Sequence, residues 1–138
     1  MKIVIDTNVL IAGLLKDSII RSILMLNSEI KFFLPEFSLS EIKKYEDVLC
    51  SKAGYTKRQL NELLTILLSN IKLVSKKEIE KYKKKGKMIM KDIDVNDSSF
   101  IATCFAINGD GIWSFDKHFE KQNEVKIFNI QDIIRMLK

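Results

Sequence analysis

The sequence is poor in the residues on which several common classes of catalytic and metal site depend. Its 138 residues include two cysteines, Cys50 and Cys104, and a single histidine, His118. The cysteines stand in unrelated contexts without metal-ligand neighbours, so the sequence predicts neither a zinc site nor a disulfide framework. The sequence contains no GxSxG motif whose serine could pair with His118, and it contains no Walker or GxGxxG motif. These absences exclude serine hydrolases of that type, P-loop nucleotide hydrolases and dinucleotide-dependent dehydrogenases.

Long apolar runs are missing as well. No stretch approaches the roughly 18 residues of a membrane-spanning helix, and no basic-then-apolar leader opens the chain. Apolar residues make up 46% of the sequence and charged residues 30%, which is an ordinary globular composition. We therefore expect a cytoplasmic protein without membrane contact. The length predicts a single domain over residues 1–138, long enough to bury about two-thirds of the surface that the unfolded chain exposes.

The positive charge is concentrated in one segment. Residues 75–91 contain eight lysines and two glutamates, a local net charge of +6, whereas the whole chain has a formal net charge of +5. Such a segment favours the approach of a polyanion from one side. It could instead be an amphipathic helix with a solvated lysine face, because Ile79, Tyr82, Gly86 and Ile89 recur at helical spacing.

Short apolar runs alternate with segments of helical periodicity along the chain. Strands are predicted at 3–5, 31–35, 71–74, 111–116 and 126–130. Helices are predicted at 9–15, 19–26, 38–49, 56–68, 75–91, 92–108 and 131–137, of which the first two could be one broken helix. Capping-box spacing occurs at Ser38 and Glu41, at Thr56 and Gln59, and at Ser75 and Glu78. The alternation predicts an α/β fold, a three-layer α/β/α sandwich with a central parallel sheet of four to five strands.

The first strand runs directly into a carboxylate. Residues 3–5 are a β-branched run typical of a strand buried on both faces, and Asp6, Thr7 and Asn8 follow it. Parallel sheets carry their functional groups at the carboxyl ends of the strands. Asp6 could therefore be a metal ligand, or it could only cap the helix that follows. The number of other acids at the same rim decides between these interpretations.

Four further acids are predicted at this rim. Asp116 ends the fourth strand, and Asp94 and Asp97 lie at the start of the central helix. Glu41 lies in the first turn of the helix after the second strand, where only helix phase separates it from Glu36 and Glu46. Each acid alone has a capping interpretation. Clustered carboxylates, however, repel one another, so their convergence indicates a divalent cation, Mg²⁺ or Mn²⁺.

Four short motifs appear in order along almost the whole chain. They are IDTNVL with Asp6 and Asn8, LSEI with Glu41, DVNDSSFIATCFA with Asp97, and WSFD with Ser114 and Asp116. In these motifs the chain resembles the PIN domain (PilT N-terminus) nucleases, which include the VapC-like toxins of toxin–antitoxin pairs. The resemblance implies a metal-dependent ribonuclease of PIN-like fold.

The resemblance also implies roles for individual residues. It makes Asp6, Glu41, Asp97 and Asp116 a catalytic, metal-binding quartet, with Asp94 as an auxiliary acid. Thr7, Asn8 and Ser114 would be polar groups that hold these carboxylates. The expected reaction is hydrolysis of RNA phosphodiesters, in which one or two Mg²⁺ or Mn²⁺ ions activate a water and neutralise the leaving 3′ oxygen.

Partners follow from the same interpretation. Beside an acidic centre, the lysine segment is expected to bind the RNA backbone through Lys77, Lys81, Lys84 and Lys85. An antitoxin protein is an expected partner of a VapC-like toxin. The leucines between Leu60 and Leu68 could form a homodimer surface, or they could equally be core.

Other functions stay open. The chain could be a PIN-fold RNA-binding or scaffold protein with little or no turnover, although a scaffold has no chemical need for four repelling acids. A nuclease acting on structured DNA would use long helical insertions that the chain lacks. A phosphoacceptor domain would need an aspartate after its middle strand, where this chain has Val74 and Ser75.

Overall fold

The computed structural model describes residues 1–26, 29–91, 93 and 97–137. In these ranges five strands form one parallel sheet in the order β3-β2-β1-β4-β5. The strands are β1 (Lys2–Ile5), β2 (Lys31–Pro35), β3 (Ile71–Val74), β4 (Gly111–Trp113) and β5 (Ile127–Phe128). The predicted α/β class and parallel sheet are confirmed.

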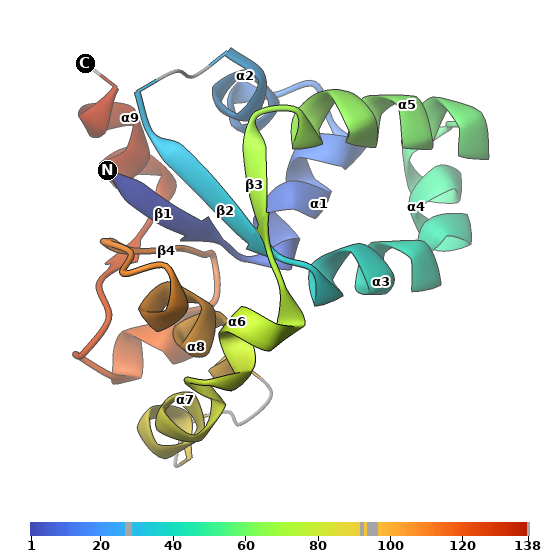
Figure 1. Ribbon diagram of the computed structural model, residues 1–138. Coiled ribbons are helices and arrows are strands. Elements are labelled where there is room, and N and C mark those ends of the chain that lie inside the picture. Colours follow the sequence, from blue (N-terminus) through green and yellow to red (C-terminus); the bar gives the residue numbers. More distant parts are fainter. Residues whose placement is uncertain (27–28, 92, 94–96, 138) are drawn as a thin grey trace.

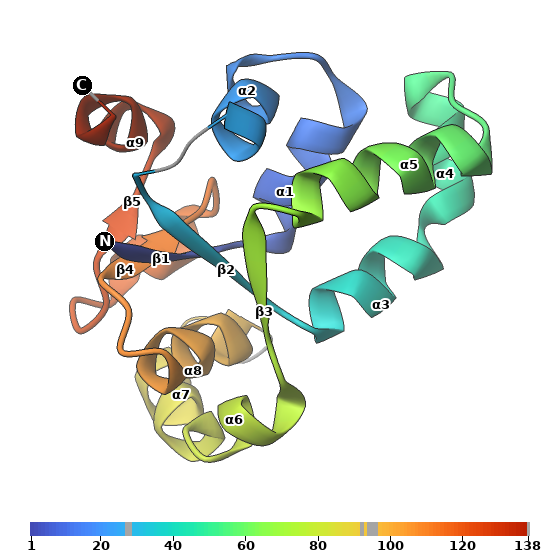
Figure 2. The same cartoon turned by 45° about the horizontal axis from the view of Figure 1, so that its top comes forward.

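Helices cover both faces of the sheet, as Figures 1 and 2 show. They are α1 (Thr7–Leu15), α2 (Ile19–Leu26), α3 (Phe37–Lys44), α4 (Glu46–Ala53), α5 (Lys57–Leu68), α6 (Lys76–Glu80), α7 (Lys83–Met90), α8 (Ser98–Ala106) and α9 (Ile130–Met136), with a 3-10 helix η2 at Lys117–Lys121. One layer contains α1, α2, α5 and α9, and the opposite layer contains α6, α7 and α8. The predicted three-layer arrangement is therefore present.

The central strand β1 explains why the chain needs both layers. Ile3 and Ile5 pack into the core cluster on the α1 side, whereas Val4 packs into the cluster that contains α8. All three side chains are fully buried. This is the result that period-two alternation produces in a strand covered on both faces.

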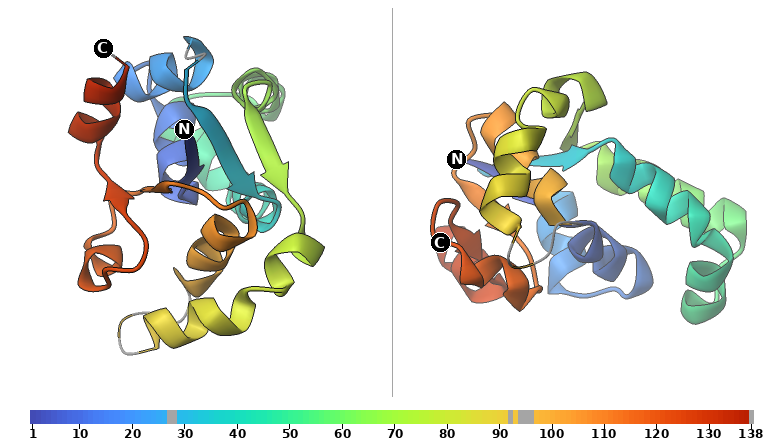
Figure 3. Two further views of the ribbon diagram at one scale, coloured as in Figure 1. Left: turned by 60° about the vertical axis from the view of Figure 1, so that its left-hand side comes forward. Right: turned by 90° about the horizontal axis from the view of Figure 1, so that it is seen from below.

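Helices α3, α4 and α5 extend away from the sheet as an arm, which Figure 3 shows from below. The sequence predicted one helix over residues 38–49, but α3 ends at Lys44 and α4 begins at Glu46. Tyr45 between them has φ −102° and ψ 16°, outside the helical region. The apolar spacing of Ile42, Tyr45 and Leu49 continues across this break, so periodicity alone could not reveal it.

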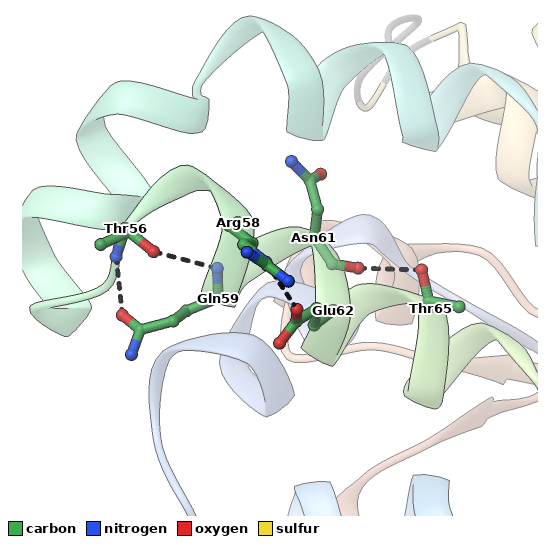
Figure 4. Close-up of polar contacts among 6 residues, drawn as sticks. All are labelled: Thr56, Arg58, Gln59, Asn61, Glu62 and Thr65. Carbon is green, nitrogen blue, oxygen red and sulfur yellow. Dashed lines mark hydrogen bonds and ion pairs between the residues drawn. The ribbon is translucent and has the colours of Figure 1, made fainter.

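The predicted capping boxes have different outcomes. Thr56 and Gln59 form one at the start of α5, with Thr56 N 2.9 Å from Gln59 Oε1 and Gln59 N 3.1 Å from Thr56 Oγ1 (Figure 4). Ser75 caps α6 by accepting from Glu78 N. The Ser38 and Glu41 box is wrong, because α3 begins at Phe37 and Ser38 is fully buried inside it.

The lysine segment is also divided. Tyr82, with φ −112° and ψ 2°, separates α6 from α7. Gly86 lies in α7 where it packs on α8, and a Cβ there would lie 2.5 Å from the Ser98 carbonyl oxygen. Gly86 is thus a close-packing point between two helices and not a break in a helix.

Several other predicted boundaries shift. Helix α1 begins at Thr7, two residues earlier than predicted, and α8 begins at Ser98 and not at 92. Strand β4 ends at Trp113, before the acid that was predicted to end it. The leucine stripe of α5 is core, since Leu60 and Leu67 are buried and Leu63, Leu64 and Leu68 pack against the same cluster. Across the described ranges, no helix has the length and apolar character needed to span a membrane.

Candidate active site

Asp6 lies at the centre of the sheet, directly after β1. Its side chain is 6% exposed. It is the N-cap of α1, where Oδ1 accepts from Asn8 N at 3.4 Å. A second, shorter bond comes from Ser114 Oγ, which lies 2.8 Å from Oδ2. Capping is therefore only part of what holds this carboxylate.

The segment after β4 meets Asp6 from the neighbouring strand. Ser114 is buried, and its Oγ also accepts a hydrogen bond from Asp116 N at 3.0 Å. Asp116 is half-buried and caps the 3-10 helix η2, with Oδ1 accepting from His118 N at 2.9 Å. Ser114 thus holds the acid after β1 and the backbone of the acid after β4 in one hydrogen-bonded arrangement.

Glu41 reaches the same region from the arm. Thr7 Oγ1 donates to Glu41 Oε1 at 3.2 Å and lies 2.7 Å from Ser38 Oγ. The buried Thr7 and Ser38 hydroxyls therefore join the start of α1 to α3. This contact fixes the phase of α3, so that Glu41 faces Asp6 while Glu36 lines a different cavity.

Asp97 enters from the opposite layer. It is the N-cap of α8, but its side chain makes no capping hydrogen bond to the described residues of that helix. The prediction that the Asp97 side chain caps α8 is therefore wrong. Asp94 lies outside the described residues.

These residues surround one cleft of about 370 Å³. Its lining residues are Asp6, Thr7, Asn8, Phe37, Glu41, Asp97, Ser99 and Phe100. Three of the four predicted quartet acids therefore share a cavity, and Asp116 adjoins it through Ser114. The side chain of Asn8 is exposed at the cleft, while its backbone amide bonds to Asp6.

Burial raises the pKa of Asp6 above its ordinary value of 3.8. The negative charge of Asp116 raises it further, while the hydrogen bonds from Ser114 and Asn8 act in the opposite direction. A buried carboxylate beside a second acid is stabilised by a cation. The donors facing this cleft are oxygen atoms of carboxylates, the ligand type that Mg²⁺ and Mn²⁺ prefer, so the residues fit such an ion.

His118 also lies beside these acids, a position that the motifs of the sequence did not predict. In the described part of the chain, Asp97, Asp116 and His118 each offer one ligand atom, and these atoms lie within 4.8 Å of one another. His118 Nδ1 is 3.5 Å from Asp116 Oδ1. The two-residue spacing from Asp116 to His118 was a signal available in the sequence.

The four predicted RNA-binding lysines do not line the acidic cleft in the described ranges. Lys77 lies on α6, Lys81 follows it, and Lys84 and Lys85 lie on α7. All four are exposed, and Lys85 Nζ lies 4.1 Å from the centroid of the Phe105 ring. The segment is therefore largely a solvated face, as its alternative interpretation required, although exposure also leaves these lysines accessible to a polyanion.

The fold and the cleft together define an α/β protein with carboxylates at the carboxyl ends of its central strands. A family model described as "PIN domain" matches residues 4–129. The chain belongs to the PIN domain family, which confirms the resemblance seen in its motifs.

One solved structure has the same fold over nearly the whole chain. It is the crystal structure of VapBC2 from Rickettsia felis bound to a DNA fragment from their promoter, with a TM-score of 0.71 and 16% sequence identity. The match covers 94% of this chain and 98% of that chain. No curated protein matches the sequence.

Proposed function

We propose that this PIN-domain protein is a metal-dependent endoribonuclease. The observation that carries the proposal is the connection between elements: Ser114 links Asp6 to Asp116, and Thr7 links α1 to Glu41. Asp97 lines the same cleft as Asp6 and Glu41. Acids from four separate elements are thus held near one another, an arrangement that helix capping does not require.

The proposed metal ligands are Asp6, Glu41, Asp97 and Asp116, with Asp94 as an auxiliary acid. A bound Mg²⁺ or Mn²⁺ ion would lower the pKa of a water molecule and neutralise negative charge on the phosphodiester. The remaining work falls to the chain's own residues. Ser114 and Thr7 orient carboxylates through the hydrogen bonds described above, and Asn8 presents an exposed amide to the cleft.

The lysine-rich segment supports RNA as the substrate. A site with this many acids repels phosphates until a cation is bound, so positive charge nearby assists the approach of a nucleic acid. We assign that long-range attraction to Lys77, Lys81, Lys84 and Lys85. All four are exposed on or beside α6 and α7.

The biological setting proposed is the toxin half of a cytoplasmic toxin–antitoxin pair. It rests on family membership and on the likeness of fold to VapBC2. An antitoxin protein is then the expected partner. A homodimer is also proposed, but the leucines of α5 do not supply its surface because they pack into the core.

The test is cleavage of labelled single-stranded RNA by purified protein in Mn²⁺ or Mg²⁺. We expect products with 5′ phosphate and 3′ hydroxyl ends, and we expect EDTA or Asp6→Asn to abolish them. Cleavage that survives both treatments would come from a contaminant or from different chemistry. RNA binding without any cleavage would instead support the scaffold alternative.

A further inference from the structure

A second cavity adjoins the acidic cleft at the side of strand β3. It has a volume of about 410 Å³ and lies between the start of α3 and helices α6 and α7. Its lining residues are Glu36, Phe37, Ser40, Lys76, Ile79, Glu80, Lys83 and Ser99. We call this cavity the α3–α6 groove. Phe37 and Ser99 line both the groove and the acidic cleft, so the two cavities meet at these residues.

Phe37 is positioned as an aromatic wall at this junction. Its side chain is half-buried, and its ring packs edge-on against Phe100, with ring centroids 5.2 Å apart and an interplanar angle of 67°. This contact fixes the ring while leaving part of it exposed to the cavities. Exposed aromatic rings beside nuclease and single-strand sites stack nucleobases, which is favourable for any base.

Two lysines form part of the same groove. Lys76 comes from the first turn of α6 and Lys83 from the start of α7. Their ammonium groups suit phosphate oxygens as point charges. Glu36 and Glu80 also line the groove, so the formal charges of its described lining residues cancel. Attraction here therefore depends on direct contact, in contrast to the long-range field of the exposed lysines.

The size of the groove indicates the size of its occupant. Cavities that hold small ligands measure about 300 to 1,000 Å³, and a volume of about 410 Å³ lies near the lower limit. An aromatic wall, two cations and a direct opening to the acidic cleft match one nucleotide of a strand whose neighbouring phosphate lies among the acids.

We propose that the α3–α6 groove binds the nucleotide next to the scissile phosphate, with its base stacked on Phe37 and its phosphate held by Lys76 and Lys83. This inference rests on the proposed ribonuclease function. It assigns substrate contact to two lysines and an aromatic residue that the charge pattern of the sequence did not single out.

The aromatic contact is tested with a short single-stranded RNA that contains 2-aminopurine, whose fluorescence is quenched by stacking. Binding of this RNA to the protein is measured with Ca²⁺ in place of Mn²⁺ or Mg²⁺. A gel shows whether the RNA strand stays intact during the measurement. Phe37→Leu should remove the quenching and weaken binding by about 5- to 100-fold. Tyr45→Leu, which removes an exposed aromatic between α3 and α4 that lines neither cavity, is the matched control and should leave both unchanged. Quenching that persists in Phe37→Leu overturns the inference.

The lysine contacts are tested independently of any folding defect, because Lys76 is exposed and Lys83 is half-exposed. The double variant Lys76→Ala/Lys83→Ala should reduce the slope of log affinity against log salt by about 0.7 to 1.4, one or two phosphate contacts. Lys77→Ala/Lys84→Ala removes the same charge outside the groove and should cause a smaller loss of affinity. Equal losses in the two pairs would overturn the inference.

The same proteins are assayed for RNA cleavage in Mn²⁺. If the wild type cleaves RNA and the groove variants bind RNA with the affinity of the wild type, the groove assignment fails and the proposed function stands. If the wild type neither binds nor cleaves RNA, the proposed function fails as well.

Discussion

Ser114 Oγ donates a 2.8 Å hydrogen bond to Asp6 Oδ2, although 108 positions separate the two residues in the sequence. The same hydroxyl accepts from Asp116 N. The segments after β1 and β4 are therefore joined by one buried side chain, and the geometry of two candidate metal ligands depends on it.

Ser114→Ala should weaken both folding and metal binding. Removing the hydroxyl leaves a buried carboxylate with fewer partners, so we expect the free energy of unfolding to fall by about 1 to 3 kcal/mol. Loss of the group that orients a ligand should reduce Mn²⁺ affinity by about 10- to 100-fold. Urea unfolding and calorimetric titration measure the two effects. Ser51→Ala, at an exposed position of α4, is the control and should change neither.

Asp6→Asn should stabilise the metal-free protein at neutral pH. The folded-state pKa of Asp6 is raised above 3.8, so its contribution to stability is fully present below pH 3.8 and is lost as the pH rises through the folded-state pKa. The substitution removes the buried charge, and the thermal midpoint in EDTA at pH 7 should exceed that of the wild type. The difference should vanish near pH 3.8 and below. A lower midpoint at pH 7 would contradict this account, and Asp17→Asn, at an exposed position before α2, is the control.

Metal affinity should fall as the pH is lowered from neutral toward about 4, through the raised folded-state pKa of Asp6. Protons compete with the cation for a carboxylate whose pKa is raised by burial and by the neighbouring Asp116. Isothermal titration with Mn²⁺ across this range measures the change, together with the number of protons released. Affinity that stays constant down to pH 3.8, the ordinary pKa of the group, would mean that Asp6 is not a ligand.

His118→Ala should weaken Mn²⁺ binding more than Mg²⁺ binding. His118 offers an imidazole nitrogen close to ligand atoms of Asp97 and Asp116, and imidazole suits transition metals better than it suits Mg²⁺. Competitive titration of the two ions gives the ratio of affinities. An unchanged ratio would show that His118 contacts the acids without ligating the metal.

Gly86→Ala should destabilise the fold next to the site. The added Cβ would lie 2.5 Å from the Ser98 carbonyl oxygen, so α7 and α8 must move apart. We expect a loss of about 1 to 3 kcal/mol in the free energy of unfolding. Because Ser98 follows Asp97, Mn²⁺ affinity should fall too. Lys87→Ala, exposed on the same helix, should leave both quantities within about 0.5 kcal/mol of the wild type.

The sheet could be predicted from the sequence because its signals are local. The run at residues 3–5 is apolar on both faces and ends at a carboxylate, and α5 begins at a capping box that the structure retains. Asp6 and Asp116 were placed at one rim because the carboxyl ends of parallel strands share an edge. These predictions required no knowledge of contacts between residues distant in the sequence.

The features that the sequence did not reveal depend on tertiary contacts. Ser38 has the spacing of a cap, but its hydroxyl lies 2.7 Å from Thr7 Oγ1, and that contact places it inside α3. The break at Tyr45 leaves the apolar periodicity intact. Lys76 and Lys83 line a cavity together with Phe37 and Ser40 of α3, an arrangement that no charge count along the chain can indicate.

The pairing of β1 also determines when the cleft can form during synthesis. Its neighbours are β2 and β4, and the second of these spans Gly111–Trp113. A nascent chain therefore emerges from the ribosome with Asp6 first, but it gains Ser114 and Asp116 only after more than one hundred further residues have been added. At about 5 to 20 residues per second this takes about 5 to 20 seconds. Throughout that time the growing polypeptide lacks the partner that holds its first acid, so the candidate metal ligands can assemble only after β4 and the residues that follow it have been synthesised.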